Sequence, residues 1–277
     1  MTLAARHQVF HNLHQTGCFV IPNPWDRGSA RMMAALGAQA LATSSAAHAF
    51  TLGRPDLGTV TRDEALAHAA DLLSATPLPV SGDFENGFGD DPGCVAETVR
   101  LAGEIGLSGI CIEDTEMTAG TPPYDFALAV ERIRAGAAAA RALGRPFIFC
   151  ARADGVMHGS YALAEGIRRL QAFEAAGADL LYLPVPPGKA DLAQILAAVT
   201  RPVNALAAGP LKSLTVAELA GMGVRRISTG SQIARLTHAA IRDSVSAMLG
   251  QGSFARLGAA ASGTEIDELL TCGSNAS

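Results

Sequence analysis

The sequence predicts a single (β/α)8 barrel. Strand-like apolar runs alternate with helix-like segments at a repeat of about 30 residues. The strand-like runs are apolar on both faces, as parallel strands buried under helices are. Eight such units can close on themselves into a barrel, and a doubly wound open sheet is the structural alternative. A length of 277 residues suits one barrel and no low-complexity linker interrupts it, so we predict one domain over 1–277.

The elements follow in order from an N-terminal helix over 1–16. A first strand over 18–21 comes next, and Asp26 or Ser29 can cap the helix after it. The further strands are expected at 38–43, 79–83, 109–113, 147–152, 180–183, 202–205 and 226–229, and the helices after the strands at 26–36, 61–75, 91–105, 125–143, 161–176, 189–198, 215–221 and 231–249.

Glycine marks the ends of several of these helices. Gly37, Gly177 and Gly223 each stand between the last helical residue and the next apolar strand, where a left-handed residue commonly ends a helix. After the last barrel helix, residues 250–277 are expected to add a short helical extension. Its polar tail, 273–277, is expected to be disordered.

The composition excludes several classes of protein. Hydrophobic residues make up 49% of the chain and charged residues 17%, which is ample material for one large core. The net charge is −5 and no basic cluster occurs, so neither nucleic acid nor an anionic membrane is expected as a partner. No run approaches the roughly 18–20 apolar residues of a membrane span. The first residues lack the apolar segment of a secretory signal.

The cysteines indicate a reducing compartment. Their number, five, is odd, and no CxxC pair occurs. Several lie in apolar strand-like runs, among them Cys111 and Cys150. We therefore expect buried free thiols in a cytoplasmic protein.

The segment Val80–Gly89 runs from an apolar strand into acid and then into glycine. Asp83 and Glu85 are two residues apart, so in an extended strand they would point to the same side. Two such carboxylates repel each other unless a cation or a proton intervenes. Gly87 and Gly89 then allow a tight loop. The segment predicts a site for a hard divalent cation, Mg²⁺, and a solvated acidic turn is the alternative.

Polar residues gather where the predicted strands end, which is where barrels of this kind form their active sites. The acids suit a metal, and Arg152 suits a carboxylate, which it can bind through two hydrogen bonds. Ser44 and Ser45 can offer backbone N–H groups to a second anionic oxygen. Together these residues predict a site for a small 2-oxo acid whose keto group a metal polarises. Strand six is nearly blank, and the other strand ends carry Asn23, Trp25, Thr43, Ser44, Ser45, Asp83, Glu85, Glu113, Asp114, Arg152, Asp154, Asn204, Ser228, Thr229 and Ser231.

From about Phe10 to Ala247 the chain resembles the isocitrate lyase/phosphoenolpyruvate mutase superfamily. The resemblance implies a (β/α)8 barrel that exchanges its last helix with a neighbour in a dimer and assembles as a tetramer, a dimer of dimers. It also implies cleavage or formation of C–C or P–C bonds beside a 2-oxo acid through a magnesium-bound enolate. The motifs are Asn23-Pro24-Trp25-Asp26, Thr43-Ser44-Ser45 with Leu52-Gly53-Arg54-Pro55-Asp56, Asp83-Phe84-Glu85-Asn86-Gly87-Phe88-Gly89, Ile112-Glu113-Asp114 and Ala151-Arg152-Ala153-Asp154.

The same resemblance implies roles for individual residues. Asp83 matches the direct ligand of Mg²⁺, with Mn²⁺ as the alternative ion, and Glu85 and Glu113 match the other acids of the metal site. Asp83, Glu113, Arg152 and Asp56, the last near the mouth, are the expected catalytic residues. The residues expected to hold the oxo acid are Trp25, Ser44, Ser45, Arg152 and Asn204.

Two departures from the family pattern narrow the expected reaction. The family's DxD is Asp83-Phe84-Glu85 here, which preserves the charge. The loop 114–124 lacks the cysteine, lysine and histidine of the isocitrate lyases and the asparagine of the mutases. We therefore expect a carbon–carbon lyase for a small 2-oxo or 2-hydroxy dicarboxylate such as oxaloacetate. The alternatives are a phosphonopyruvate mutase or hydrolase and a barrel that binds an oxo acid without catalysis.

Structural interpretations remain open for several of these residues. Arg152 can pair with Asp154 or Glu113 instead of with substrate, Trp25 can belong to the core, and the two serines can cap a helix. His48 and His158 are expected in loops near the mouth, as solvated residues, and proton transfer is the alternative role. The other histidines lie on predicted helices and are expected at the surface: His7, His11, His14, His68 and His238.

Overall fold

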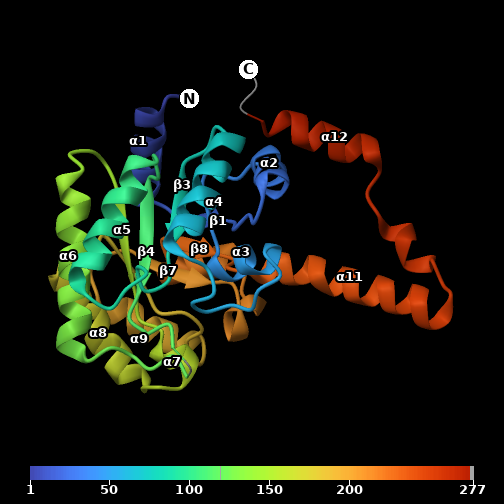
Figure 1. Cartoon of the computed structure of the whole chain (residues 1–277). Coiled ribbons are helices and arrows are strands. Elements are labelled where there is room, and N and C mark those ends of the chain that lie inside the picture. Colours follow the sequence, from blue (N-terminus) through green and yellow to red (C-terminus); the bar gives the residue numbers. More distant parts are fainter. Residues whose placement is uncertain (119, 275–277) are drawn as a thin grey trace.

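The strands form the predicted barrel. The computed structural model describes residues 1–118 and 120–274. Within these residues eight parallel strands pair in the order β1-β8-β7-β6-β5-β4-β3-β2 (Figure 1). The seam between β1 and β2 is bridged by a hydrogen bond of 3.2 Å from the N–H of Ala42 to the carbonyl of Pro22. The strands are β1 (Phe19–Ile21), β2 (Leu41–Ala42), β3 (Val80–Asp83), β4 (Gly109–Glu113), β5 (Ile148–Arg152), β6 (Leu180–Tyr182), β7 (Val203–Leu206) and β8 (Arg226–Ser228).

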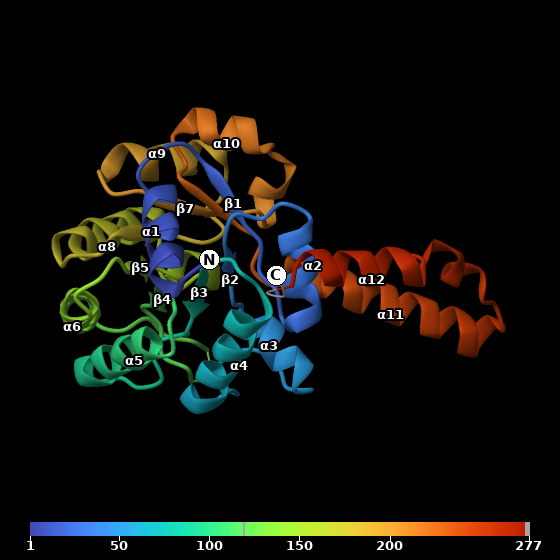
Figure 2. The same ribbon diagram turned by 90° about the horizontal axis from the view of Figure 1, so that it is seen from above.

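Helices surround the strands, as the view along the barrel shows (Figure 2). The N-terminal helix α1 (Leu3–Leu13) packs its fully buried Phe10 against side chains of the barrel interior. The outer helices are α2 (Arg27–Ala35), α4 (Arg62–Ala75), α5 (Pro92–Glu104), α6 (Phe126–Ala142), α8 (Leu163–Ala175), α9 (Lys189–Ala198) and α10 (Val216–Met222).

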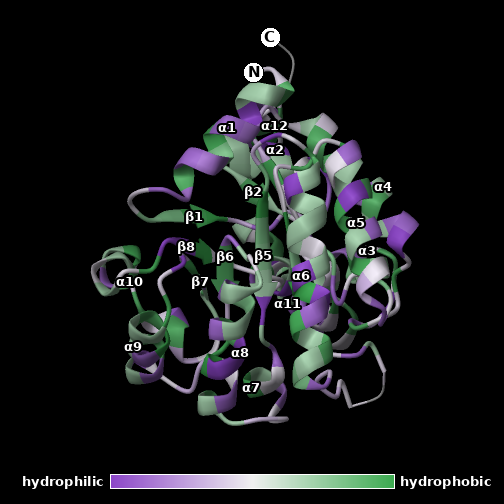
Figure 3. Cartoon of the chain, turned by 90° about the vertical axis from the view of Figure 1, so that its left-hand side faces the viewer, coloured by the Kyte–Doolittle hydropathy of each residue, from purple (hydrophilic) through white to green (hydrophobic). Residues whose placement is uncertain are grey.

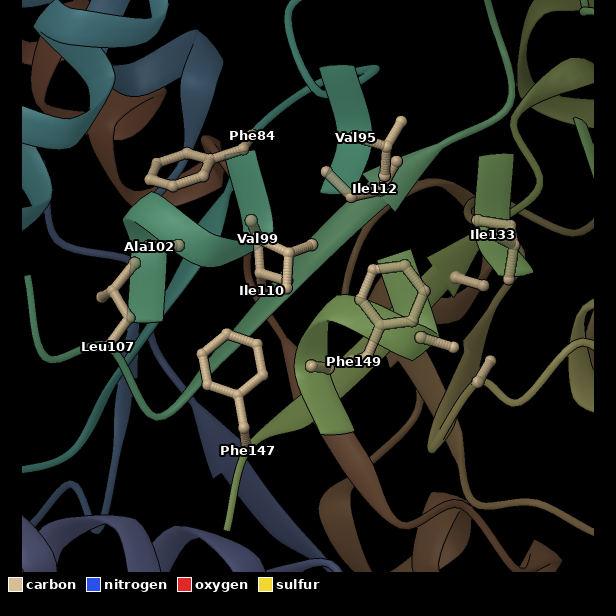
Figure 4. Packing of buried hydrophobic residues seen from close by; sticks show 14 of the residues in the cluster. Phe84, Val95, Val99, Ala102, Leu107, Ile110, Ile112, Ile133, Phe147 and Phe149 are labelled. Carbon is tan, nitrogen blue, oxygen red and sulfur yellow. The ribbon is translucent and has the colours of Figure 1, made fainter. Parts of the chain in front are cut away.

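The largest part of the core lies between the strands and the outer helices. Side chains of β4 and β5 pack there against α5 and α6 (Figure 4). Phe149 occupies space that only a glycine at position 136 leaves open, since a Cβ there would lie 2.4 Å from the Phe149 ring. Figure 3 shows the resulting pattern, with hydrophobic strands inside and hydrophilic residues on the outer helices.

The last barrel helix does not cover its own barrel. In Figures 1 and 2 α11 (Gln232–Gln251) projects away from the strands, and α12 (Gly263–Cys272) returns to pack on α2. Apolar side chains of α11 are consequently exposed, with Leu236 at 69% and Leu249 at 85%. On β1, the outward side chain of Val20 is also exposed.

Most predicted elements are confirmed, with ends that differ by a few residues. The second strand is shorter than 38–43 because only Leu41–Ala42 pairs with β3. Two short helices escaped prediction because they lie in loops: α7 (Gly155–His158) and the 3-10 helix η1 (Gly209–Ser213). Helix α3 (Ser45–Thr51) is the helix that the two serines could cap, and the 3-10 helix η2 (Ala255–Ala259) lies in the expected helical extension.

Two further predictions concern the histidines of α1 and the C-terminal tail. His7 and His14 are buried, not at the surface, because α1 turns them towards the end of the barrel. In the tail expected to be disordered, Gly273 is the C-cap of α12, while 275–277 lie outside the described residues.

Among the described residues, no helix is both long enough and apolar enough to cross a lipid bilayer.

Candidate active site

A cavity of about 350 Å³ opens at the carboxyl ends of the strands. The loops after β2, β5, β7 and β8 and the first turn of α11 form its walls. Of the nine residues expected to have a catalytic, ligand-binding or metal-binding role, five line this cavity: Ser44, Ser45, Asp56, Asp83 and Arg152. Other polar residues predicted at the strand ends line it as well: Asn23, Thr43, Ser228, Thr229 and Ser231.

Asp83 ends β3 and points to the cavity. Its backbone N–H donates to Thr43 Oγ1 at 2.7 Å. Its Oδ2 accepts hydrogen bonds from the N–H of Ser45 at 3.0 Å and from Ser45 Oγ at 2.9 Å. Its Oδ1 lies 3.6 Å from Arg152 Nη1. Asp83 is therefore held rigidly, with one oxygen fully engaged and the other shared with a cation.

For Ser44 and Ser45 the sequence left open whether they cap a helix or line the ligand site. Ser44 is the N-cap of α3, where its Oγ accepts a hydrogen bond of 3.3 Å from the N–H of Ala47. Ser45 is the first residue of that helix and donates to Asp83. Both also line the cavity. The N–H of Ser45 therefore orients the carboxylate of Asp83 and is not free for a ligand.

Arg152 is the centre of an ion-pair network at the end of β5. It lies 3.0 Å from Glu113 Oε2 and donates from Nε to Asp154 Oδ1 at 2.5 Å. Burial raises the pKa of Glu113 well above its usual value, although Arg152 opposes that shift. Burial alone would also raise the pKa of Asp154, but Arg152 and His158 hold it below its usual value. The predicted pairing of Arg152 with both acids is therefore present in this structure.

Glu85 does not share a side of the strand with Asp83, as the extended-strand reasoning predicted. β3 ends at Asp83, and Glu85 adopts a positive φ of 45°, which turns the chain. Its Oε1 accepts a hydrogen bond of 3.1 Å from the N–H of Gly58, and burial raises its pKa to about 7. Both carboxylates nevertheless face one small interstice of about 10 Å³, the volume of about one water molecule.

The acids here outnumber the cations that can neutralise them. Within the described residues, Glu85 Oε2 and Glu113 Oε1 are buried and have no hydrogen-bond partner. Unpaired buried carboxylate oxygens are costly, and oxygen donors of this kind suit Mg²⁺ or Mn²⁺. In the described part of the chain no three acidic, histidine or cysteine side chains are close enough to bind an ion together. These oxygen donors are of the kind that suits a hard cation, although the described residues do not form a group of three ligands.

Asp56 lies in the loop after α3 and lines the mouth of the cavity. Desolvation raises its pKa and the nearby Asp83 adds to this, while the N–H of Leu57 opposes it with a hydrogen bond of 2.8 Å. A carboxyl of raised pKa at a cavity mouth is a candidate for proton exchange with a ligand.

Two predicted ligand-binding residues do not line the cavity. Trp25 is half-buried beside α4, where its carbonyl accepts a hydrogen bond of 2.9 Å from His68 Nε2. Asn204 is buried inside the barrel and both ends of its amide are occupied. It donates to Ser228 Oγ at 2.9 Å and accepts from Arg226 Nε at 2.7 Å.

The structure also assigns positions to the remaining candidates. Asp114 accepts from the N–H of Asp154, from Tyr161 Oη and from Arg169, so it anchors the loop after β5. His158 Nε2 lies 3.7 Å from Asp154 Oδ2. His48 is buried on α3, not in a solvated loop, and its ring stacks on His68 at 3.9 Å.

Sequence reasoning missed three residues that line the cavity. Tyr182 ends β6, which looked nearly blank, and its ring lies 5.3 Å from the Arg152 guanidinium. Its position on a predicted strand was the available signal. Arg226 begins β8 and Arg235 lies in α11. Nothing local marked either arginine, because Arg226 reaches the cavity through the curvature of the barrel and Arg235 through the direction of α11.

Comparisons with known proteins agree with the fold. The model of the phosphoenolpyruvate phosphomutase family matches residues 10–249. A crystal structure from Burkholderia cenocepacia J2315, provisionally described as a lyase/mutase, superposes with a TM-score of 0.91 at 45% identity, covering 96% of this chain and 95% of that one.

Two relatives carry more specific names. Oxaloacetate decarboxylase of Paraburkholderia xenovorans is 30% identical over 87% of this chain and 81% of its own length. The structure of an oxaloacetate acetylhydrolase in complex with oxalate has a TM-score of 0.84 at 26% identity, covering 97% of this chain and 94% of that one.

Proposed function

Because the chain belongs to the phosphoenolpyruvate phosphomutase family, we propose that it is a lyase that cleaves a carbon–carbon bond in a small 2-oxo or 2-hydroxy dicarboxylate. The proposal includes a divalent cation, Mg²⁺ or alternatively Mn²⁺. One observation carries it: Asp83 lines the cavity, and together with the buried Glu85 and Glu113 it makes more carboxyl groups than Arg152 can neutralise. The names of the two relatives, both acting on oxaloacetate, support this class of substrate.

The acids of the site would bind the cation, and Arg152 would bind the substrate. Asp83, supported by Glu85 and Glu113, would hold the cation, which polarises the substrate carbonyl and stabilises the enolate that forms on cleavage. Arg152 would bind the carboxylate next to that carbonyl, and the three acids around it fix its orientation. Ser45 keeps Asp83 in place.

The loop 114–124 narrows the reaction further. It holds no cysteine, lysine or histidine, so it offers none of the usual basic or thiol groups for proton transfer. Decarboxylation of a 2-oxo dicarboxylate needs no base, because the bond to the leaving CO₂ supplies the electrons of the enolate. We therefore rank decarboxylation of an oxaloacetate-like substrate first. Cleavage of phosphonopyruvate at its P–C bond is the alternative.

The proposal also includes an oligomer in which α11 packs on a second subunit. Leu236, Ile241 and Leu249 of α11 are exposed, and Val20 of β1 is exposed on the outer face of the barrel. Exposed apolar side chains on a projecting helix are typical of subunit interfaces. Light scattering of the purified protein should give a dimer or tetramer mass. A monomer at micromolar concentration would contradict this part.

The test is pyruvate release from oxaloacetate, with phosphonopyruvate as a parallel substrate. We expect pyruvate from oxaloacetate above the uncatalysed rate in the presence of Mg²⁺, and loss of it on chelation with EDTA and recovery with added Mg²⁺. The metal-catalysed background is subtracted with a sample that contains Mg²⁺ and no protein. Phosphate release from phosphonopyruvate would move the assignment to P–C chemistry. Turnover that is unchanged by EDTA would refute the metal.

A further inference from the structure

The side of the cavity opposite Asp83 has the reverse charge. The described lining residues from β7, β8 and the start of α11 include no acid. They include Arg226 and Arg235, with the hydroxyl groups of Ser228 and Ser231 between them. We refer to these four residues as the basic side of the cavity.

Arg226 is a buried cation that forms no ion pair with a carboxylate among the described residues. Its side chain is 4% exposed and lines the deep end of the cavity, one inward position below Ser228 on β8. Nε donates to Asn204 Oδ1 at 2.7 Å and Nη2 to Cys150 Sγ at 3.6 Å. Nη1 has no hydrogen-bond partner within the part of the chain that the structure describes. A buried guanidinium with an unused donor and no counter-charge favours an anion nearby.

A chain of hydrogen bonds carries this polarity to the cavity. Asn204 accepts from Arg226 with Oδ1, so its Nδ2 must donate, and it donates to Ser228 Oγ at 2.9 Å. Ser228 Oγ accepts that bond and keeps its own O–H to donate. Since Ser228 lines the cavity, its hydroxyl is set to donate to a ligand.

The N-terminus of α11 adds to the positive electrostatic potential on the basic side. This helix has 20 residues, its N-cap Ser231 makes no side-chain cap, and its first turn holds no acid. The positive end of the helix dipole therefore faces the cavity uncompensated. Arg235, one turn into the helix, is exposed at the mouth and makes no ion pair with any described residue.

From this arrangement we infer that the basic side is a second anion subsite, which holds the distal carboxylate of the substrate while Arg152 holds the proximal one. The inference rests on the proposed function and makes it more specific, because it requires a dicarboxylate. A cavity of about 350 Å³ accommodates a four-carbon diacid that bridges the two sides. Arg226 acts as the buried charge of the subsite, and Ser228, Arg235 and the N-terminus of α11 supply the donors.

Calorimetry with two probes separates the sides. The two carboxylates of oxalate are bonded directly to each other, so oxalate fits the proximal side alone, whereas two carbons separate the carboxylates of L-malate and let it reach both sides. In the presence of Mg²⁺, Arg226→Met and Arg235→Gln should each weaken L-malate at least about tenfold, the value of one charge-assisted hydrogen bond. Both variants should bind oxalate within about twofold of the parent. Arg242→Gln, on the exposed part of α11, is the matched control and should change neither affinity.

The outcomes are distinct. If both variants bind L-malate as tightly as the parent protein does, the subsite is overturned while the proposed function stands. The same holds if the variants lose affinity for oxalate and for L-malate by the same factor. Binding of neither probe by the parent protein overturns both. If Arg226→Met fails to fold by circular dichroism, the exposed Arg235→Gln decides the question. Phosphonopyruvate that binds more tightly than L-malate and loses that advantage in Arg235→Gln would reassign the subsite from a carboxylate to a phosphonate.

Discussion

The two sides of the cavity differ in how their charges are balanced. Around Asp83 and Arg152, three carboxyl groups converge on one guanidinium, and among the described residues three buried carboxylate oxygens, on Glu85, Glu113 and Asp154, have no hydrogen-bond partner. On the basic side, Arg226 and Arg235 form no ion pair with a carboxylate of the residues that the structure describes. One side needs a cation and the other needs an anion, so the cavity complements a ligand whose carbonyl and distal carboxylate lie at opposite ends.

The largest expected effect is on the acidic side. Asp83→Asn removes the negative charge but keeps the shape, and should lower kcat/KM by about a thousandfold, the effect of losing one preorganised electrostatic group. Steady-state pyruvate release measures it. Asp71→Asn, an exposed acid on α4 paired with Arg27, is the control and should retain parental turnover. If Asp83→Asn keeps the parental activity, the carboxylate of Asp83 takes no part in the reaction.

Arg152→Lys should have the next largest effect. Lysine keeps the charge but cannot bridge Glu113 and Asp154 while binding a carboxylate through two bonds. We expect a fall in kcat/KM of about a hundredfold, with weaker binding of oxalate and of L-malate alike. Selective weakening of L-malate would mean that Arg152 serves the distal end, and the two sides would have to be exchanged.

Asn204→Ala tests the basic side through the residue that hydrogen-bonds both Arg226 and Ser228. It removes the acceptor of Arg226 Nε and the donor to Ser228 without altering either residue. One buried hydrogen bond of this kind corresponds to about 1.4 kcal/mol, so L-malate should bind about tenfold more weakly. Oxalate affinity should stay unchanged. If L-malate and oxalate binding weaken by the same factor, Asn204 stabilises the barrel in general and does not act on the basic side specifically.

The smallest effect concerns stability beneath the basic side. Burial lowers the pKa of His14 to about 3 from 6.5, and Arg226 adds to this, so the folded protein keeps His14 neutral. The unfolded chain takes up a proton as the pH falls through 6.5, and folding loses stability from there down towards pH 3. At pH 5.5 His14 should cost about 1.4 kcal/mol relative to pH 7.5.

Urea denaturation at the two pH values checks this contribution. His14→Leu should lose less stability between them than the parent does. His11→Gln, on the same helix but partly exposed, should follow the parent. A His14→Leu variant with the full parental pH dependence would show that other groups cause the acid sensitivity.

The sequence alone determined the barrel and most of the acidic side. Apolar runs and helix-ending glycines are local patterns, and in this fold a residue at a strand end lies at the active face whatever the details of packing. Asp83, Ser45 and Arg152 could therefore be predicted to lie together, and the structure brings them together.

Only the tertiary structure decided the rest. A positive φ at Glu85 turns that carboxylate out of the strand pattern. The strand curvature carries Arg226 across the interior from β8 to Cys150 on β5. The direction of α11 brings Arg235 to the cavity mouth while the helix leaves the barrel. These features depend on backbone shape and on contacts between residues far apart in the chain, which no local pattern encodes.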